Sequence, residues 1–527
     1  MKKKFEIEDA EFDFKYEKNR SNLDIRFNRI SFIFFIFFVI STIFSIHLIH
    51  LGSRNVKHSD NNENSFQKKL HRADIVDRNG KYVVKTVSSI NIGINPAQVI
   101  DKKKLLINLR YIFPNKNFYE LRKKLNKNKF FWFEKKISQE NYEKIMNLGD
   151  KSIIPEERLT RLYPQRNLFS HIIGQIDDNN NGISGLERSL DIKLKEEKYS
   201  VELTVDTDIQ YLIREELIKF NEIFRAQGSA AILMNVNDGE VLSLVSLPDF
   251  DPNKRERITD KNFINRATKG VYEFGSVFKT FTLAAAFNEK IIKPDTEFIN
   301  LPKSIKCAGF PIREYDQEIP SNLTAEQILI RSGNIGSVRI GQKVGEGKFR
   351  SFLSKIDVLG QTKFDIEEIG RPIKFTWGKC PLATASFGHG ITTTLLQLAK
   401  AYSIIVNGGY EIKPKLVKSS KKIKRKKILN EDVSEKILPI LRKIVATKAG
   451  TASLANITGY DVGGKTGTAQ KSISGNYTNK KINSFISVFP TNQPKFVLAV
   501  MLDEPKTNEN YIYNYRDGSN IKFKGTP

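Results

Sequence analysis

The spacing of hydrophobic and polar positions changes several times along the chain, and each change predicts a different element. Residues 30–50 carry almost only apolar side chains, mainly Phe and Ile, with no charge. As a helix, such a run spans about 30 Å, the thickness of one hydrocarbon core. We predict a single transmembrane helix over residues 30–50, followed by a polar linker over residues 51–70.

The flanks of this run predict its orientation. Arg26 and Arg29 lie directly before it, so we expect residues 1–29 to be a cytoplasmic tail and the rest of the chain to lie outside. A cleaved signal peptide is the alternative. No small-residue cleavage site follows the run, so we expect an uncleaved anchor in the cytoplasmic membrane.

Residues 51–200 predict a separate, elongated α/β module. Asn79 and Gly80 form a turn signal between two short apolar runs, which favours a tight turn between strands. Residues 101–150 are rich in Lys and show helical spacing.

From residue 201 to residue 527 the pattern predicts a second, larger domain. Strands are expected at residues 201–205, 230–236, 241–246, 485–489 and 496–502, with a helix from about Ile209. Asn237, Asp238 and Gly239 separate two of these runs and predict a hairpin. The residues between the early and late strands are largely helical. The fold class is therefore α+β, with one antiparallel sheet closed by its first and last segments and covered by helices.

Charge and cysteine content narrow the classes of partner. The net charge of +26 suits an anionic partner, but the basic residues are spread along the whole chain, and an external location leaves us expecting no nucleic acid. The densest basic run, residues 413–427, is predicted to be an exposed hairpin or loop. The two cysteines, Cys307 and Cys380, could form one bridge outside the cytoplasm, although we favour free thiols. We expect no metal and no cofactor.

The first candidate for chemistry is Ser276, which precedes an apolar helical stretch. Lys279 lies three residues later, so both side chains share one helix face. A serine hydroxyl becomes a nucleophile when a base removes its proton, and a buried lysine with a lowered pKa is such a base. Ser-x-x-Lys alone is common, and a capping serine followed by a surface lysine is the alternative.

Two further segments add polar groups. Ser332 and Asn334 follow a helix predicted to begin at Thr324, where Thr324 and Gln327 have capping-box spacing. We expect both side chains to be free on a loop, with Ser332 relaying a proton and Asn334 holding Lys279 and a substrate amide. An ordinary helix-ending turn is the alternative.

Lys465, Thr466, Gly467 and Thr468 follow two glycines and predict a strand that another backbone approaches closely. Lys465 with Thr466 or Thr468 could bind a substrate carboxylate, and a polar edge strand is the alternative. The three segments together give the set Ser-x-x-Lys, Ser-x-Asn and Lys-Thr-Gly, which the chemistry of serine acyl transfer uses in this order.

On these motifs, the chain resembles a class B penicillin-binding protein. Residues 265–276, residues 385–391, residues 72–80 and residues 182–187 also resemble stretches of that family, and the resemblance covers about residues 25–505. It implies a peptidoglycan D,D-transpeptidase in which Ser276 attacks the penultimate D-Ala carbonyl of a stem peptide and an amine then resolves the ester. Catalytic residues would be Ser276, Lys279, Ser332, Asn334 and Lys465. Substrate-binding residues would be Thr466, Gly467 and Thr468, with the oxyanion hole at the N–H groups of Ser276 and Thr468.

The resemblance also implies partners and leaves alternatives. β-Lactams would acylate Ser276, and a membrane glycosyltransferase and other division proteins would be partners. The division-specific, FtsI-like branch is favoured over the elongation-specific branch. A β-lactamase or carboxypeptidase, and a non-catalytic scaffold or β-lactam sensor, are rivals from other classes. The family closes its catalytic domain with a long helix, whereas the residues before Pro527 lack helical spacing, which predicts a truncated C-terminus.

Overall fold

The computed structural model describes residues 31–49, 71–254, 264–419, 425–473, 476–514 and 520–522. The chain divides into two units, residues 1–70 and residues 71–527. In the first unit Ser31–Ile49 forms one helix of 19 residues with a mean hydropathy of 2.6. Its length and composition suit one membrane crossing, which confirms the predicted apolar helix over these residues. Ile30, His50 and the linker lie outside the described residues.

The second unit begins with a five-stranded sheet built around one long strand. Strand β2 (Tyr82–Ile94) pairs with β1 (Ile75–Val76) near its start, and with β3 (Phe131–Ile137) and β4 (Ile153–Leu162) further along. The fifth strand, β5 (Val201–Glu202), pairs in parallel with β1. The backbone N–H of Asp77 donates to the carbonyl of Lys81, and Gly80 has φ +82°, so the Asn-Gly turn is confirmed. Helices α3 (Lys102–Ile112), α4 (Phe118–Asn126) and α5 (Gln139–Met146) share an apolar core with these strands. The Lys-rich region is therefore helical as predicted, apart from β3.

Three segments far apart in the sequence meet in a largely buried ionic cluster of this module. We call Arg72, Arg161, Glu187 and Asp191 the module cluster. The Arg72 guanidinium lies 2.7 Å from a Glu187 carboxylate oxygen and 2.6 Å from Asp191, and Arg161 lies 2.8 Å from Glu187. Glu187 and Asp191 belong to the short helices α7 (Gly185–Ser189) and α8 (Asp191–Glu196). Each buried charge thus faces an opposite charge, as burial requires.

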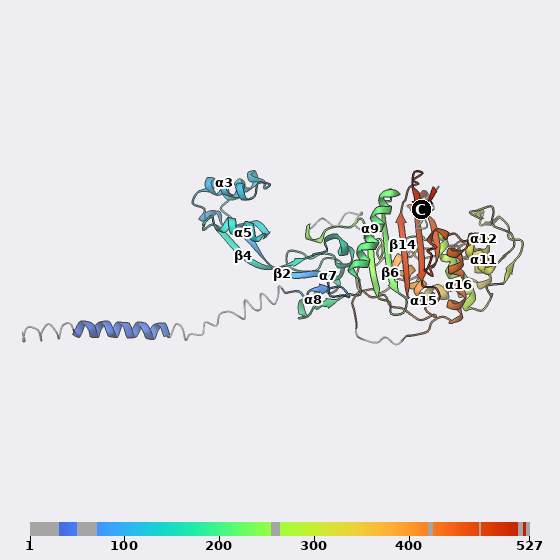
Figure 1. The fold of residues 1–527 in the computed structure, drawn as a ribbon, viewed down its shortest axis with the longest axis horizontal. Coiled ribbons are helices and arrows are strands. Elements are labelled where there is room, and N and C mark those ends of the chain that lie inside the picture. Colours follow the sequence, from blue (N-terminus) through green and yellow to red (C-terminus); the bar gives the residue numbers. More distant parts are fainter. Residues whose placement is uncertain are drawn as a thin grey trace, which may run out of the picture. The chain divides into compact units, whose positions relative to one another are not determined.

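The second sheet has the strand order β12-β13-β14-β6-β7 and is antiparallel throughout (Figure 1). Its strands are β6 (Gly228–Asn235), β7 (Val241–Leu247), β12 (Gly463–Ile473), β13 (Asn476–Phe489) and β14 (Phe496–Asp503). The early strand β6 pairs with the late strand β14, as predicted. The strand predicted at residues 201–205 was wrongly placed, because Val201–Glu202 pairs with β1 and so belongs to the first sheet. The predicted α+β class is confirmed.

Helices cover both faces of this sheet because its side chains alternate. Ile232 and Met234 of β6 belong to the main core, which includes the buried helices α10 (Phe278–Asn288) and α15 (Leu395–Val406). Ala231, on the opposite face, packs with Leu217 of α9 (Thr207–Ile223). The remaining helices on the core side are α11 (Ala325–Ile330), α12 (Asn334–Val344), α13 (Glu346–Lys355), α14 (Lys379–Ala385) and α16 (Asp432–Ala446).

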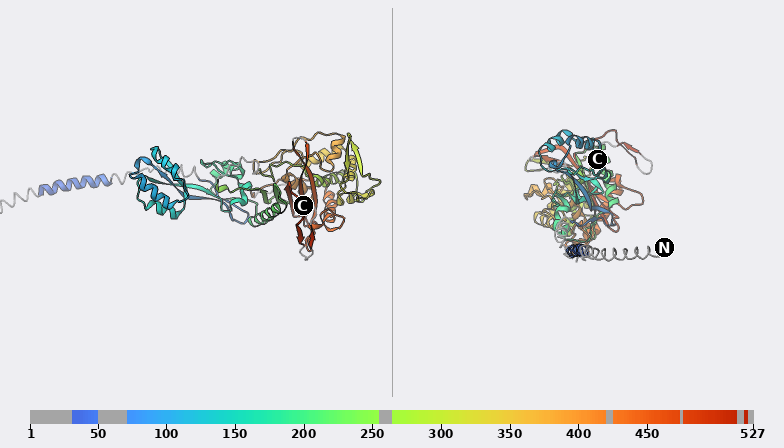
Figure 2. Two further views of the ribbon diagram at one scale, coloured as in Figure 1. Left: turned by 90° about the horizontal axis from the view of Figure 1, so that it is seen from above. Right: turned by 90° about the vertical axis from the view of Figure 1, so that its left-hand side faces the viewer.

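The short strands between the helices form small pairs. They are β8 (Glu297–Phe298) with β11 (Leu323–Thr324), β9 (Ser304–Cys307) with β10 (Phe310–Arg313), and β15 (Ile512–Asn514) with β16 (Asn520–Lys522). Figure 2 gives two further views of the ribbon. Part of the predicted basic loop, residues 420–424, lies outside the described residues.

The two cysteines are joined, so the expectation of free thiols was wrong. Cys307 on β9 and Cys380 on α14 form a disulfide across 73 residues of sequence. Their proximity depends on how the β9–β10 hairpin packs against α14, and nothing in their sequence spacing reveals that. The bridge ties together two segments that each continue into the candidate active site.

Candidate active site

Ser276 lies where a short 3-10 turn, Gly275–Val277, passes into helix α10. Its residue is half-buried, whereas Lys279, on the first turn of α10, is 1% exposed. All residues of α10 from Phe278 to Phe287 are buried, which is the composition of a helix surrounded by protein. The Tyr402 hydroxyl of α15 donates to the carbonyl of Val277 at 2.9 Å and so fixes the start of the helix.

Ser332 lies between the two lysines. Its Oγ accepts from Lys465 Nζ at 2.9 Å and from Lys279 Nζ at 3.2 Å, and its carbonyl also accepts from Lys279. The predicted capping box at Thr324 and Gln327 is confirmed, and α11 ends just before Ser332. Ser332 has φ +57°, a conformation that costs energy for a residue with a side chain. The expectation that its side chain would be free was wrong, because both ammonium groups bind it.

Lys465 lies on strand β12, the strand that the sequence predicted, and its side chain points into the core. It is fully buried, and its Nζ also donates to the carbonyl of Thr466 at 3.0 Å. The Thr466 hydroxyl lies 2.9 Å from that of Thr451. A Cβ placed on Gly467 would lie 2.3 Å from the carbonyl oxygen of Phe274, so only glycine lets β12 pass this close to the turn before Ser276.

Burial sets the acidity of both amines. It lowers the pKa of Lys279 to about 7, although the charge of Glu314 acts in the opposite direction. Burial, followed by repulsion from Lys279, lowers the pKa of Lys465 well below its ordinary value. A buried amine with no carboxylate in contact loses its proton more readily because the charged form is poorly solvated.

Asn334 takes a different partner from the expected one. Its Nδ2 donates to the carbonyl of Arg313 at 2.8 Å rather than to Lys279. Its backbone N–H donates to Glu314, at 2.6 Å, and so does that of Ile335, at 2.9 Å. Sequence reasoning missed Glu314, whose buried carboxylate accepts from the first N–H groups of α12 and so holds the Ser332–Asn334 loop.

The three motifs line one cavity of about 540 Å³. Ser276, Ser332, Asn334, Thr466 and Thr468 all contribute to it. The backbone segments around Ser276 are in close contact. A Cβ on Gly275 would lie 2.3 Å from the Thr468 carbonyl oxygen, and one on Gly388 would lie 2.0 Å from the Gly275 carbonyl oxygen. Ser276 therefore lines the cavity together with β12, the Ser332 loop and residues 387–389.

A second group of side chains lies at this cavity, and the sequence analysis assigned none of them a function. We call Glu273, His389 and Tyr477 the rim cluster. Glu273 accepts from the Tyr477 hydroxyl at 2.9 Å and from the backbone N–H of Gly390 at 2.8 Å. The His389 and Tyr477 rings stack with their centroids 4.5 Å apart. Only the spacing of Glu273 to Ser276, one helical turn, could have suggested its position.

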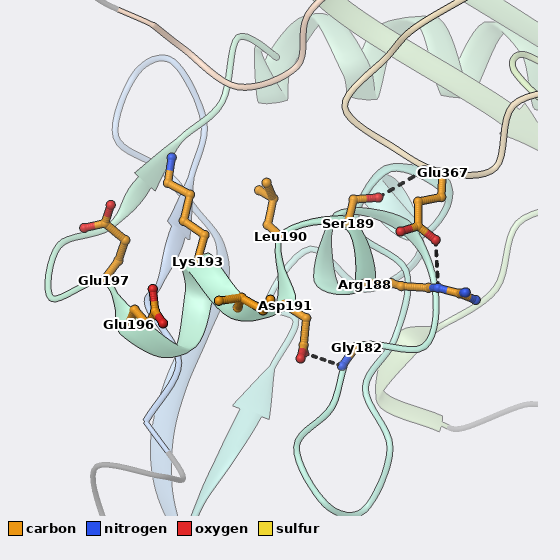
Figure 3. A pocket seen from close by; sticks show the side chains of 10 residues that line it. Gly182, Arg188, Ser189, Leu190, Asp191, Lys193, Glu196, Glu197 and Glu367 are labelled. Carbon is orange, nitrogen blue, oxygen red and sulfur yellow. Dashed lines mark hydrogen bonds and ion pairs between the residues drawn. The ribbon is translucent and has the colours of Figure 1, made fainter. Parts of the chain in front are cut away.

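A larger hollow of about 900 Å³ lies elsewhere, between the base of the module and residue 367 (Figure 3). There Arg188 pairs with Glu367 at 2.9 Å, and the Glu367 backbone N–H donates to Ser189. None of the three motifs contributes to its lining. Size alone does not make it a site, and the residues of the three motifs line the smaller cavity.

Fold and site together define a class of protein. A serine at a helix start, a buried amine on the same turn, a Ser-x-Asn loop and a Lys-Thr-Gly edge strand are the arrangement of a penicillin-recognising serine acyltransferase. Residues 229–519 match the penicillin binding protein transpeptidase domain, and residues 68–217 match the penicillin-binding protein dimerisation domain. The chain belongs to the penicillin-binding proteins and is an enzyme of the serine-type transpeptidase class.

Several relatives support the assignment over most of the chain. A probable peptidoglycan D,D-transpeptidase FtsI of Caulobacter vibrioides is 30% identical, over 83% of this chain and 77% of its own length. The stage V sporulation protein D of Bacillus subtilis is also 30% identical, over 82% of this chain and 74% of the relative. The peptidoglycan D,D-transpeptidase FtsI of Buchnera aphidicola is 28% identical, over 84% and 83%. The domain boundary predicted at residue 200 stays a prediction.

Proposed function

We propose that this protein is a peptidoglycan D,D-transpeptidase that crosslinks stem peptides through an ester on Ser276. The observation that carries the proposal is the convergence of two buried ammonium groups, those of Lys279 and Lys465, on the hydroxyl of Ser332 in the cavity that Ser276 lines. A buried amine whose pKa is about 7 is half neutral near physiological pH, which suits a general base.

The proposed reaction has two halves. Lys279 accepts the Ser276 proton as Oγ attacks the penultimate D-Ala carbonyl, and Ser332 returns a proton to the terminal D-Ala, which leaves as an amine. An amine of a second stem peptide then attacks the ester, forms the new amide and releases Ser276. The two lysines and Ser332 form one hydrogen-bonded chain along which the proton moves in both halves.

Substrate binding is assigned to the edge strand and the Ser332 loop. Thr466, Gly467 and Thr468 would align the stem terminus along β12, where the substrate carboxylate restores the charge of Lys465. Asn334 would bind the substrate amide from the opposite side of the cavity. The backbone N–H groups of Ser276 and Thr468 would stabilise the oxyanion, a contribution worth about 3 kcal/mol in comparable enzymes. The close contact between Gly275 and Thr468 supports this placement.

β-Lactams would enter the same cavity and acylate Ser276, because their ring carbonyl mimics the stem terminus. The apolar helix Ser31–Ile49 would anchor the chain in the cytoplasmic membrane with its N-terminus inside and the catalytic domain outside. Partners would include a membrane glycosyltransferase and other division proteins. No glycosyltransferase motif was found in the sequence, so a partner would make the glycan.

Septal synthesis is the growth process we favour. Two of the relatives named above carry the name FtsI, which supports a division-specific role. Depletion in the source cell tests it: filaments are expected, whereas rounded cells would indicate the elongation-specific alternative.

The test of the chemistry is covalent labelling of the full chain by a fluorescent penicillin. Ser276→Ala is expected to abolish labelling, and Ser472→Ala, an exposed serine of β12, is the matched control that should label normally. Strong labelling of the Ser276→Ala protein would refute the assigned nucleophile. Rapid turnover of a chromogenic cephalosporin by the wild type would indicate a hydrolase instead.

A further inference from the structure

The rim cluster presents a carboxylate to the catalytic cavity without a strong cationic partner. The Glu273 side chain is 11% exposed, and within the described residues its only ion-pair contact is His389 Nδ1 at 3.8 Å. Its two hydrogen bonds, from Tyr477 and from Gly390, satisfy its oxygens but bring no positive charge. A carboxylate held in this way attracts a cation.

Three aromatic rings lie beside the Glu273 carboxylate and add a surface that a cation can contact. Phe387, His389 and Tyr477 form a stack, with centroids 6.0 Å and 4.5 Å apart. Tyr477 is 42% exposed, so much of its ring is accessible to a ligand. Burial and the charge of Glu273 raise the pKa of Tyr477, which keeps the phenol protonated and donating to Glu273. A ring face beside a carboxylate is a favourable environment for an ammonium group.

The position of the cluster relates it to the reaction. Glu273 lies three residues before Ser276, and both line the cavity together with His389. The stem terminus is assigned to residues 466–468 of β12 and to the Ser332 loop, whereas Tyr477 pairs with Ser472, further along β12. The rim cluster therefore borders the region from which a second substrate must approach the ester.

We propose that Glu273, His389 and Tyr477 form the subsite that binds the ammonium group of the acceptor stem peptide. The inference rests on the proposed function and deepens it by assigning the second substrate a place. Glu273 supplies the charge, the exposed Tyr477 ring supplies an apolar face, and His389, stacked between Phe387 and Tyr477, holds that ring in place. These groups bind and orient the acceptor and do not touch the scissile ester.

The bound ammonium gives one proton to water at the open mouth of the cavity. The neutral amine then attacks the ester carbonyl carbon, the C–N bond forms, and the bond from that carbon to Ser276 Oγ breaks. The second proton leaves the amine nitrogen and returns to Ser276 Oγ through Lys279. No oxidant, reductant or further reactant is needed.

An ammonium group could also come from the donor stem peptide, and the test separates the two sources. The full chain in detergent is acylated with a thioester donor, and kcat/KM is measured for two acceptors. One is a stem peptide with a free side-chain ammonium, and the other is hydroxylamine, which is uncharged at neutral pH. Glu273→Gln keeps the shape and removes the charge. We expect it to lower kcat/KM for the ammonium acceptor about fivefold and to leave that for hydroxylamine unchanged.

The controls make each outcome decisive. Lys481→Gln removes an opposite charge from the lining of the same cavity and should not lower use of the ammonium acceptor. If Glu273→Gln folds poorly, Tyr477→Leu removes the exposed ring and should lower use of the ammonium acceptor alone. Equal losses for both acceptors, or no loss, would overturn the proposal. Slower acylation by an ammonium-bearing donor, with acceptor use intact, would overturn it as well.

The inference and the proposed function fail differently. If the wild type forms no Ser276-dependent ester with a fluorescent penicillin, the proposed function is wrong. If the ester forms and the acceptor preference of the Glu273→Gln protein equals that of the wild type, only the subsite is wrong.

Discussion

The module cluster and the lysine pair at the active site are both buried and charged, but their charges are balanced differently. In the module cluster, Arg72 and Arg161 contact the carboxylates of Glu187 and Asp191 at 2.6–2.8 Å. At the active site, Lys279 and Lys465 share a neutral hydroxyl, and no carboxylate within the described residues contacts either amine. A buried cation that contacts a carboxylate keeps its charge. A buried amine without a carboxylate in contact has a lowered pKa and can therefore act as a base.

The largest expected effect comes from removing one amine of the lysine pair. Lys279→Met should slow acylation by a fluorescent penicillin about 10³-fold, because Ser276 loses its base. The free energy of unfolding should stay equal or rise, because an apolar chain of similar length replaces a buried amine without a carboxylate partner. Stopped-flow labelling and urea unfolding measure the two quantities. Acylation within tenfold of the wild type would contradict the proposed role of Lys279.

Breaking the module cluster should lower the stability of the fold and leave the acylation rate unchanged, the reverse of the Lys279→Met result. Glu187→Ala leaves two buried guanidinium groups without their shared partner and should lower the free energy of unfolding by about 3–5 kcal/mol. The acylation rate of the folded fraction should not change. Glu197→Ala, an exposed carboxylate on the same segment, is the matched control for urea unfolding. A stable Glu187→Ala protein with slow acylation would show that the two regions are not independent.

A smaller expected effect is a pH dependence of acylation and of stability that arises at the lysine pair and not at Asp191 of the module cluster. Because the pKa of Lys279 is about 7, acylation should fall about tenfold per pH unit below that value, as the amine becomes protonated. The unfolded chain binds this proton up to the ordinary lysine value of 10.5, so the Lys279 contribution makes stability rise with pH between the two values. Burial would raise the pKa of Asp191, but hydrogen bonds from Lys195 and Arg72 lower it to about 2, so Asp191 adds no pH dependence of stability between about 7 and 10.5.

The pH profile is checked by single-turnover acylation and by urea unfolding across the same range. Lys279→Met should lose the pH dependence of acylation and its own share of the pH dependence of unfolding, while the lowered pKa of Lys465 leaves the remaining share. If the variant keeps the same profile of unfolding, another group causes it.

The motifs could be predicted because each depends on near neighbours in the sequence. Ser276 and Lys279 share a helix face, Thr324 and Gln327 cap one helix, and the glycines of β12 permit close approach. The order of the sheet followed from strands at both ends of the domain. These are local rules of spacing, and the structure agrees with them.

The contacts that depend on packing between distant segments could not be predicted. Glu314 reaches the N–H groups of Asn334 and Ile335 from a separate hairpin, and the disulfide joins β9 to α14. The side chain of Ser332 was expected to be free, because nothing near it in sequence shows that two lysines lie beside it. Strand β3 was missed because it is rich in Lys, which suggested a helix.

The parallel pairing of β1 with β5 (Val201–Glu202) has a practical consequence for dissecting the chain. After Val76 the polypeptide adds β2, β3 and β4 to this sheet, builds the helices of the module and returns at Val201 beside β1. The Asp77 carboxylate then accepts from the Thr207 hydroxyl and backbone at the start of α9. A fragment beginning at residue 201 would therefore lose strand β1, and the backbone N–H and C=O groups of β5 that pair with β1 would be left without partners. A soluble catalytic fragment should begin at about His71 instead.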